Sequence, residues 1–510
     1  MDRVSEAPWL AQRAKATPER EALRCEGRSI SYAALDRGAR RAGRALCRAG
    51  VEAGERVAVA VAPGPHALEL LHGLSYARAV LLPLNLRLTA AELEYQLRDC
   101  GATRVVVEGD DAGAGAAREA ASRVGAALHE LAELHRGVWD DGDDGDDGRL
   151  ARRIDAASPF AILYTSGTSG RPKGATLSYA NFRASAVGSA QLLGVRSDDL
   201  WLACMPLFHV GGLSIATRSV LAGTSMLLHR RFDPAAVARD LDREGVTLVS
   251  LVASMLARVL DARGDAGPPP QLRAALLGGG PTPPSLIERA RKAGFPVAPT
   301  YGLTEATSQV ATRPPDARGE PLDAGLQPLP GLRVQVVDAS GRPLAPGAVG
   351  EVRVQGPTVM GGYWGRPDES ARALAGGWLH TGDLGALDAD GRLRIVDRRS
   401  DLIVSGGENV YPAEVEAVLM THPGVAEAAV VGEPDPVYGR RPVACIVVRP
   451  GGPLWGEGPE GTHAALVAHC RDRLARYKVP VRFERVESLP RTATGKLRRR
   501  DVRSPAVELV

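Results

Sequence analysis

Apolar side chains recur along much of the chain with the spacing of helices. Residues 31–46 carry apolar side chains at every third or fourth position, at Leu35, Ala39, Ala42 and Leu46. Ser31 stands directly before this stretch, where a hydroxyl can accept a hydrogen bond from the first turn of a helix. The pattern therefore predicts an amphipathic helix that begins after Ser31.

Short, continuous apolar runs separate such helices. They fall at 56–62, 104–107, 161–164, 333–337, 351–354 and 393–395. Runs of this length, bounded by turn residues, are typical of buried strands. Thr89 and Glu92 form a capping-box pattern that begins a helix between two of these runs. Because strands and helices alternate between residues 31 and 107, we predict an α/β fold with parallel sheets.

The last quarter of the chain repeats the pattern on a smaller scale. Apolar runs at 428–431 and 443–448 predict two strands, and the spacing over 463–477 predicts a helix. A segment rich in glycine and proline, 451–461, is expected to form a surface loop. We therefore expect a second, compact α/β unit at the C-terminal end.

Composition restricts the class of protein. With 510 residues, 44% of them hydrophobic, the chain can form two or more domains with sizeable cores. Its 63 basic and 60 acidic residues nearly balance, which argues against a nucleic-acid or anionic-membrane partner. No apolar run reaches the roughly 18 residues of a membrane span, and no secretory signal is evident. Six scattered cysteines without a C-x-x-C pair suit buried thiols in a reducing cytoplasm.

An acidic repeat, Asp-Asp-Gly three times over, occupies residues 140–148. Carboxylates at this density could bind Ca²⁺, but the repeat lacks the ligand order and closing glutamate of an EF-hand. We expect a solvated loop that connects two subdomains.

A stretch rich in glycine and hydroxyl groups follows the run at 161–164. It reads Thr-Ser-Gly-Thr-Ser-Gly-Arg-Pro-Lys-Gly over residues 165–174. Glycines bring backbone N–H groups close to an anion, hydroxyls add donors, and Lys173 adds positive charge. The spacing matches neither the usual P-loop nor G-x-G-x-x-G. The stretch predicts a polyphosphate-binding loop, and the alternative is a flexible surface loop.

Two further strand ends carry candidate nucleotide contacts. A strand at 276–277 runs into Gly278, Gly279 and Gly280, where a flat group can lie against bare backbone. Thr304 and Glu305 place a hydroxyl and a carboxylate side by side after Tyr301. Such a pair can serve a phosphate and its Mg²⁺.

The roles of three single residues cannot be decided from their local sequence alone. His209 lies in an apolar, glycine-containing turn and is either a packing residue or a neighbour of the substrate. Asp383 suits a ribose diol but is equally typical of a turn. Lys496 follows Thr-Gly in what reads as an exposed turn near the C-terminus.

Together these motifs resemble the adenylate-forming superfamily, which comprises acyl- and aryl-CoA synthetases, firefly-type luciferases and peptide-synthetase adenylation domains. The motifs at 165–174, 301–305, 377–383, 398–409 and 491–497 stand in that family's order. The resemblance implies a large N-terminal domain of packed α/β subdomains, residues 1–399, and a small mobile C-terminal α/β domain, residues 400–510. The hinge maps to Ser400, where many relatives carry an acidic residue, and Asp401 is its acidic neighbour.

The resemblance also implies a two-step reaction that uses ATP, Mg²⁺ and coenzyme A. A small carboxylic acid reacts with ATP to give an acyl-adenylate, and a thiol then takes the acyl group. The implied catalytic residues are Lys173, Thr304, Glu305 and Lys496, with Glu305 as the metal ligand. Lys496, on the mobile domain, would leave after the first step.

The remaining implied contacts form two groups. Residues expected to hold the nucleotide or line the approach of the thiol are Thr165, Ser166, Gly167, Thr168, Ser169, Gly170, Gly278, Gly279, Gly280, Tyr301, Asp383, Arg398, Ser405, Gly406 and Gly407. Residues expected to line the acid are His209, Gly302 and Ser308.

Sequence variants near His209, Ser308 and Arg398 are most similar to the 2-succinylbenzoate–CoA ligases of menaquinone biosynthesis. Other hypotheses stay open at this point. They are a ligase for fatty or other aryl acids, a free-standing enzyme that charges a carrier protein, a luciferase-like oxygenase and an adenylate-binding regulator without activity. A regulator is expected to lack Glu305 or Lys496, and both are present. A homodimer is also an open expectation.

Overall fold

The computed structural model describes most of the chain. The described residues are 5–134, 148–165, 172–280, 282–314, 324–398, 403–405, 408–410, 412–435, 438–474, 476–492 and 497–502, with the backbone alone at 397, 398, 404, 408, 409, 439 and 500. Within these ranges no helix combines the length and the apolar character needed to cross a membrane. The acidic repeat at 140–148 lies outside them except for Gly148.

One sheet of seven strands is formed by described residues of the N-terminal part. Its order is β20 (Gly362–Tyr363), β10 (Lys173–Ser178), β9 (Pro159–Thr165), β5 (Val80–Pro83), β4 (Arg56–Ala60), β6 (Arg104–Val107) and β7 (Ala127–Glu130). From β9 to β7 neighbouring strands are parallel, whereas β10 runs antiparallel to both β9 and β20.

Helices cover both faces of this sheet. Successive strand residues point to opposite sides, so each face presents apolar side chains for helices to pack against. Val57 and Leu81 share a core with α2 (Tyr32–Arg48) and α3 (Pro65–Tyr76). Ala58 and Leu82 pack with α4 (Ala90–Cys100) and α5 (Ala112–Val124).

A second sheet, of nine strands among the described residues, carries most of the predicted site. Its order is β17 (Gln327–Pro328), β16 (Ser308–Thr312), β15 (Val297–Leu303), β14 (Ala274–Leu277), β13 (Leu248–Leu251), β11 (Leu200–Ala203), β12 (Ser225–Leu228), β2 (Glu21–Cys25) and β3 (Arg28–Ser31). From β15 to β2 the strands are parallel, and both edges are antiparallel.

Two groups of helices cover the two faces of the second sheet. On one face, α1 (Trp9–Ala16), α7 (Tyr179–Leu193) and α8 (Val210–Ala222) share a core with α3, so this layer joins the two sheets. On the other lie α9 (Pro234–Arg243), α10 (Ala253–Arg263) and α11 (Pro284–Lys292).

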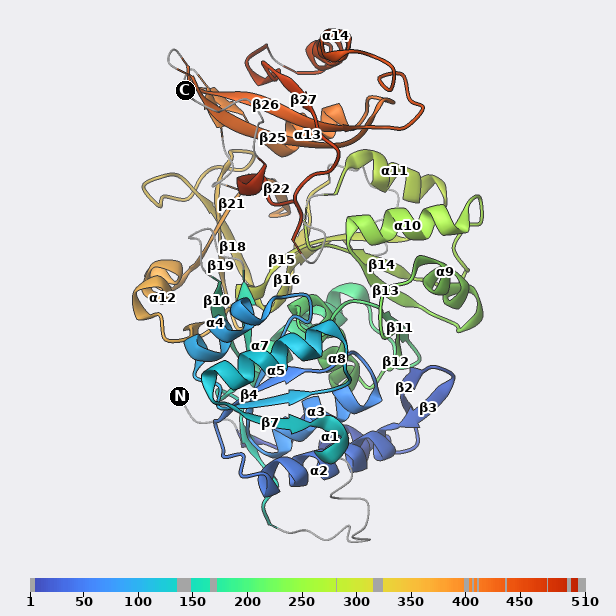
Figure 1. The fold of residues 1–510 in the computed structure, drawn as a ribbon, viewed down its shortest axis with the longest axis vertical. Coiled ribbons are helices and arrows are strands. Elements are labelled where there is room, and N and C mark those ends of the chain that lie inside the picture. The colour runs from blue at the N-terminus through green and yellow to red at the C-terminus, as the bar shows by residue number, and fades with distance from the viewer. Residues whose placement is uncertain are drawn as a thin grey trace.

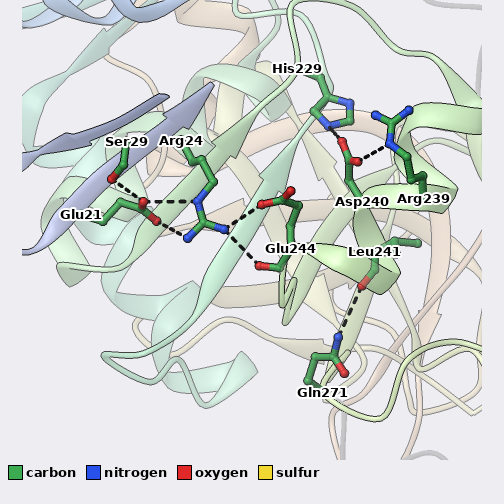
Figure 2. A network of polar contacts seen from close by, with 9 residues as sticks. All are labelled: Glu21, Arg24, Ser29, His229, Arg239, Asp240, Leu241, Glu244 and Gln271. Carbon is green, nitrogen blue, oxygen red and sulfur yellow. Dashed lines mark hydrogen bonds and ion pairs between the residues drawn. The ribbon is translucent and has the colours of Figure 1, made fainter. Parts of the chain in front are cut away.

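A polar network fastens the outer hairpin of the second sheet to α9 (Figure 2). The Arg24 guanidinium donates to Glu21 Oε1 at 2.8 Å and to Glu244 Oε2 at 2.8 Å. Nearby, His229 Nε2 lies 3.0 Å from Asp240 Oδ2 on α9. These contacts are remote from the predicted site residues and are structural.

Antiparallel strands dominate the rest of the chain. A sheet of β18 (Arg333–Val337), β19 (Gly350–Gln355), β21 (Leu379–Leu387) and β22 (Leu393–Arg398) is flanked by α12 (Pro367–Ala373). A final sheet joins β24 (Glu408–Val410), β23 (Ile403–Ser405), β26 (Gly439–Val448), β25 (Val425–Asp435) and β27 (Phe483–Arg485), with α13 (Pro412–Leu419) and α14 (Pro459–Arg471). Figure 1 places this final unit at one end of the long axis, beyond β21 and β22.

Short elements complete the architecture of the described residues. β1 (Ser5–Glu6) pairs with β8 (Ile154–Asp155), and the 3₁₀ turns are η1 (Thr304–Ala306), η2 (Ala375–Gly377), η4 (Arg476–Lys478) and η5 (Arg499–Asp501).

Local sequence patterns predicted several boundaries correctly. Ser31 caps α2, because its hydroxyl accepts a hydrogen bond from the Ala34 N–H at 3.3 Å, and Thr89 and Glu92 form the predicted capping box. The sheets beyond residue 330 are antiparallel, apart from the β26–β27 pair. The bounds of one predicted helix are wrong, because the helix expected over 463–477 spans Pro459–Arg471. Pro459 suits the first helical turn, and Pro480 disfavours helix in the residue before it.

Candidate active site

The predicted polyphosphate loop joins two antiparallel strands. Thr165 at the end of β9 pairs in register with Lys173 at the start of β10. The loop residues Ser166, Gly167, Thr168, Ser169 and Gly170 lie outside the described residues. The Thr165 hydroxyl is buried and has no hydrogen-bond partner in the part of the chain that the structure describes. A ligand oxygen would satisfy it.

Lys173 and Glu305 approach one another through a tyrosine that the sequence did not single out. The Lys173 ammonium lies 5.2 Å from the centre of the Tyr363 ring. The Tyr363 hydroxyl donates to Glu305 Oε1 at 2.9 Å. The structure thus brings together the lysine and the carboxylate that the sequence analysis placed at phosphate and Mg²⁺.

Thr304 and Glu305 stand on a tight 3₁₀ turn between β15 and β16. The backbone beyond the turn is unusual, because Thr307 and Ser308 have φ angles of 52° and 86°. Non-glycine residues rarely adopt such angles and do so mainly where the surroundings enforce them. Here the Ser185 hydroxyl donates to the Thr307 carbonyl and the Thr307 hydroxyl donates to the Thr358 carbonyl, both at 2.7 Å.

Gly302 is required by the same turn. A Cβ atom at this position would lie 1.7 Å from the Ser308 carbonyl oxygen, which no side chain tolerates. This close approach accounts for glycine on packing grounds, and its contact with the acid stays a prediction, as it does for Ser308.

The three glycines after β14 follow the strand that pairs with β15, and Gly278 lies against Thr300 of β15. A Cβ atom on Gly278 would come within 2.6 Å of Thr300 Cγ2, and Gly279 has a φ of +85°. Gly280 has open space where a side chain would be. These positions leave the backbone bare beside β15, as the nucleotide prediction requires.

Asp383 occupies a strand and not the predicted turn. It lies inside β21 and is only 4% exposed. The Tyr301 hydroxyl donates to Asp383 Oδ2 at 2.6 Å, and the Asp383 N–H donates to the Thr381 hydroxyl at 3.1 Å. The β21–β22 register sets Asp383 opposite the backbone of Arg398. The pattern His-Thr-Gly-Asp resembles a turn, but His380 pairs with Arg353 of β19 and Asp383 pairs with Arg398 of β22, with an irregularity in the β19–β21 ladder between them.

His209 occupies the N-cap position of α8, where its carbonyl accepts from the Leu213 N–H at 3.0 Å but its side chain makes no capping hydrogen bond. Burial, assisted by the charge of Arg87, lowers the pKa of His209 to about 4, so the ring is neutral at pH 7. Its Nε2 atom is buried and has no partner among the described residues. A neutral ring with an open nitrogen suits a contact with a bound group.

Arg218 is a second residue that the sequence analysis missed. It lies on α8, 4% exposed, and lines a small cavity between α7, α8 and Trp201. Its Nη2 donates to the Ser185 hydroxyl at 3.3 Å, but its Nε has no partner and no described carboxylate neutralises it. Burial lowers the pKa of Arg218 to about 9, which still leaves it charged at pH 7. One charge in the otherwise uncharged helix 210–222 was the available signal.

The remaining predicted contacts belong to the C-terminal unit. Ser405 ends β23 and is buried. Gly406, Gly407 and Lys496 lie outside the described residues, as does the hinge at Ser400 and Asp401. The domain boundary between residues 399 and 400 therefore stays a prediction, and so does the role of Lys496.

Thr304 and Glu305, Lys173 and the Tyr301–Asp383 pair are the described residues of the nucleotide site that the sequence predicts. The chain belongs to the AMP-binding enzyme family. Residues 10–364 match the AMP-binding enzyme model, and residues 414–496 match the model of its C-terminal domain.

Similar proteins of known name point to one branch of this family. The chain is 43% identical to 2-succinylbenzoate–CoA ligase from Geobacillus kaustophilus over 497 residues, covering 97% of both chains. The corresponding ligase of Bacillus cereus strain AH820 is 39% identical, with 98% of both chains covered.

Solved structures agree in fold along nearly the whole chain. The o-succinylbenzoate CoA synthetase of Bacillus subtilis in complex with the acyl-adenylate OSB-AMP has a TM-score of 0.89 at 35% identity, with 98% of both chains covered. The same enzyme with ATP and magnesium gives 0.88 at 35% identity, covering 98% of this chain and 99% of that one. The predicted α/β fold, with a large N-terminal and a small C-terminal domain, is confirmed.

Proposed function

We propose that this protein is an ATP-dependent acid–CoA ligase whose best acid is 2-succinylbenzoate. The observation that carries the proposal is 43% identity to a 2-succinylbenzoate–CoA ligase over 97% of both chains. The product would be 2-succinylbenzoyl-CoA, an intermediate for menaquinone biosynthesis. The substrates ATP and coenzyme A, and Mg²⁺ as cofactor, follow from the same likeness.

Adenylation overcomes a chemical difficulty. A carboxylate is a poor electrophile, and AMP is a far better leaving group than oxide. In the first step a carboxylate oxygen attacks the α-phosphorus of ATP and pyrophosphate departs. In the second step the thiol sulfur attacks the acyl carbon and AMP departs with the bonding electrons. Charge develops on the phosphates in the first step, so cations and donors placed there lower its barrier.

The proposal gives each of the described site residues a role in the first step. We assign Lys173 and the Thr165 hydroxyl to the β- and γ-phosphates, Thr304 to an α-phosphate oxygen, and Asp383 with Tyr301 to the nucleoside. These assignments use the buried, unpartnered Thr165 hydroxyl and the Tyr301–Asp383 contact at 2.6 Å.

Glu305 fits Mg²⁺ by its chemistry. Mg²⁺ bound with a nucleotide commonly takes one or two carboxylates and completes its shell with phosphate oxygens and water. Glu305 supplies one such carboxylate, and the described residues contain no cluster of three His, Cys, Asp or Glu side chains that could hold a metal without the nucleotide. Bound there, Mg²⁺ would neutralise charge on the departing pyrophosphate.

The buried charge of Arg218 favours an acid substrate that carries a second negative charge. A buried guanidinium without a counter-ion is costly. Through Ser185 it lies two hydrogen bonds from Thr307, next to the predicted acid contact Ser308. 2-Succinylbenzoate keeps one carboxylate that does not react, and that group would neutralise Arg218.

A panel of acids tests the proposal. Release of AMP that depends on coenzyme A would be measured with 2-succinylbenzoate, substituted benzoates and fatty acids. We expect the highest kcat/KM for 2-succinylbenzoate. A higher kcat/KM for a medium- or long-chain fatty acid would overturn the substrate but leave the acid–CoA ligase class intact. AMP release that did not depend on any added acid would contradict both.

We also infer that the enzyme works in the cytoplasm. All six cysteines are free thiols, which suits a reducing compartment, and none of the described helices could span a membrane. A homodimer is a separate expectation, which analytical ultracentrifugation would test.

A further inference from the structure

We propose that Tyr363 is a positioning residue that holds Lys173 and Glu305 apart and ready for the magnesium–nucleotide complex. Its ring lies under the Lys173 ammonium and its hydroxyl donates to Glu305. One side chain therefore touches both charged groups of the proposed phosphate and metal site. This inference rests on the proposed function.

The backbone around Tyr363 fixes its position with respect to both partners. β20 pairs with β10 in a register that sets Tyr363 opposite Ala175, two residues from Lys173. The Trp364 N–H donates to the Gly174 carbonyl, and the Met360 N–H donates to the Glu305 carbonyl, both at 2.8 Å. Residues 360–364 thus connect the lysine strand to the Glu305 turn.

A further contact locks the tyrosine itself. The Tyr363 N–H donates to the Ser370 hydroxyl at 2.8 Å, at the start of the helical segment α12. Tyr363 is half-buried. Its hydroxyl donates to the Glu305 carboxylate at 2.9 Å.

The consequence is electrostatic. An ammonium and a carboxylate that contact the same tyrosine attract each other, and without the tyrosine between them they could pair directly. Such a pair would occupy the carboxylate oxygen needed by Mg²⁺ and the charge needed by the phosphates. A ring face attracts the cation and a hydroxyl attracts the anion, so Tyr363 satisfies both groups without joining them.

This arrangement affects only one half of the reaction. Polyphosphate and Mg²⁺ take part in adenylate formation, whereas the transfer of the acyl group from adenylate to a thiol involves no pyrophosphate. Loss of Tyr363 should therefore weaken magnesium–nucleotide binding and the first step, and should leave the second step near its normal rate.

The test uses the full-length protein with Tyr363→Phe and Tyr363→Leu. Binding of ATP at a series of Mg²⁺ concentrations is measured by calorimetry without acid, so that no turnover occurs. Both half-reactions are then followed separately. For Tyr363→Phe, which keeps the ring, we expect the Mg²⁺ concentration at half-saturation to rise about tenfold, the usual effect of losing a hydrogen bond to a charged group. Tyr363→Leu should show a larger rise.

Tyr76→Phe is the matched control. The Tyr76 hydroxyl donates to Asp36 in the remote interface of α2 and α3, so this change removes a hydrogen bond of the same kind away from the site. It should lower the melting temperature and leave the Mg²⁺ dependence unchanged. An unaltered Mg²⁺ dependence in Tyr363→Phe, or an equal loss in both half-reactions, overturns the positioning role. Failure of the wild-type protein to form any acyl-adenylate would instead overturn the proposed function.

Discussion

The proposed contact between Arg218 and the acid would let a single side chain select the substrate. Its guanidinium is surrounded by α7, α8 and the Trp201 ring, whose centre lies 6.0 Å away. Within the described chain its hydrogen-bond partner is the Ser185 hydroxyl, so its charge is not neutralised. A protein keeps such a group at a cost in stability, and that cost is recovered when an anion binds.

We expect Arg218→Met to separate acids by their charge. The kcat/KM for 2-succinylbenzoate should fall by at least about tenfold, since a hydrogen-bonded counter-ion is lost, while that for benzoate changes little. The melting temperature of the ligand-free protein should rise, because an unpaired buried charge has been removed. Steady-state kinetics and calorimetry measure these effects. Equal losses for both acids, or a lower melting temperature, would contradict this role.

At the scale of elements, α3 is enclosed on nearly every side. Its residues from Ala67 to Tyr76 are all buried, between the seven-stranded sheet and α2. His72 belongs to this run and is 3% exposed. Burial lowers the pKa of His72 to about 4, far below the ordinary value of 6.5. The imidazole is therefore neutral in the folded protein and takes up a proton only on unfolding when the pH is below 6.5.

A pH-dependent loss of stability follows. The contribution of His72 is complete above pH 6.5 and declines as the pH falls towards 4, by at most about 1.4 kcal/mol per pH unit. His209, with a pKa near 4, adds a similar loss. We expect His72→Leu to reduce the decline between pH 6.5 and 4.5, as measured by urea unfolding. An unchanged slope in that variant would show that His72 is protonated in the folded state.

The scale of an interaction decides whether the sequence could predict it. The helix caps at Ser31 and Thr89 involve residues three positions apart, so a local pattern contained them. Glu305 and Lys173 were recognisable because each stands in a dense motif. Tyr363 was missed because its contacts depend on pairing between β20 and β10, and no local pattern encodes that pairing. The strand position of Asp383 was missed for the same reason, since its pairing with Arg398 of β22 is not encoded in its neighbours along the chain.

At the scale of the whole molecule, the two predicted domains divide the chemistry. Lys173 and Glu305 lie in the matched N-terminal part, residues 10–364, whereas Lys496 belongs by sequence to the matched C-terminal domain, residues 414–496. A double mutant of the B. subtilis enzyme, bound to its product analogue, fits this chain less closely, with a TM-score of 0.73, than the enzyme with OSB-AMP, at 0.89. We therefore expect the relative placement of the two parts to matter for the reaction.

Lys496→Ala should separate the two steps. If Lys496 stabilises charge on the attacking carboxylate and the α-phosphate, adenylate formation should fall by on the order of a hundredfold or more. The same variant, given synthetic acyl-adenylate and coenzyme A, should form thioester at a near-normal rate. Rapid-quench measurement of each step tests this.

Lys478→Ala provides a control within the same C-terminal part. The Lys478 ammonium binds Glu414 Oε1 at 2.6 Å, so its removal perturbs that unit without a predicted role in catalysis. The ratio of its two half-reaction rates should be unchanged. If Lys496→Ala slowed both steps equally, we would withdraw Lys496 as the adenylation residue.

The two-residue strand β20 has a consequence for solubility. It is the terminal strand of the seven-stranded sheet and covers one side of β10. An uncovered strand exposes unpaired N–H and C=O groups that can recruit a strand from another molecule. Pro367, shortly after β20, cannot donate a ladder hydrogen bond and helps to end the sheet there. Engineering that loosens residues 360–364 to admit other substrates would therefore uncover β10 and favour aggregation between molecules.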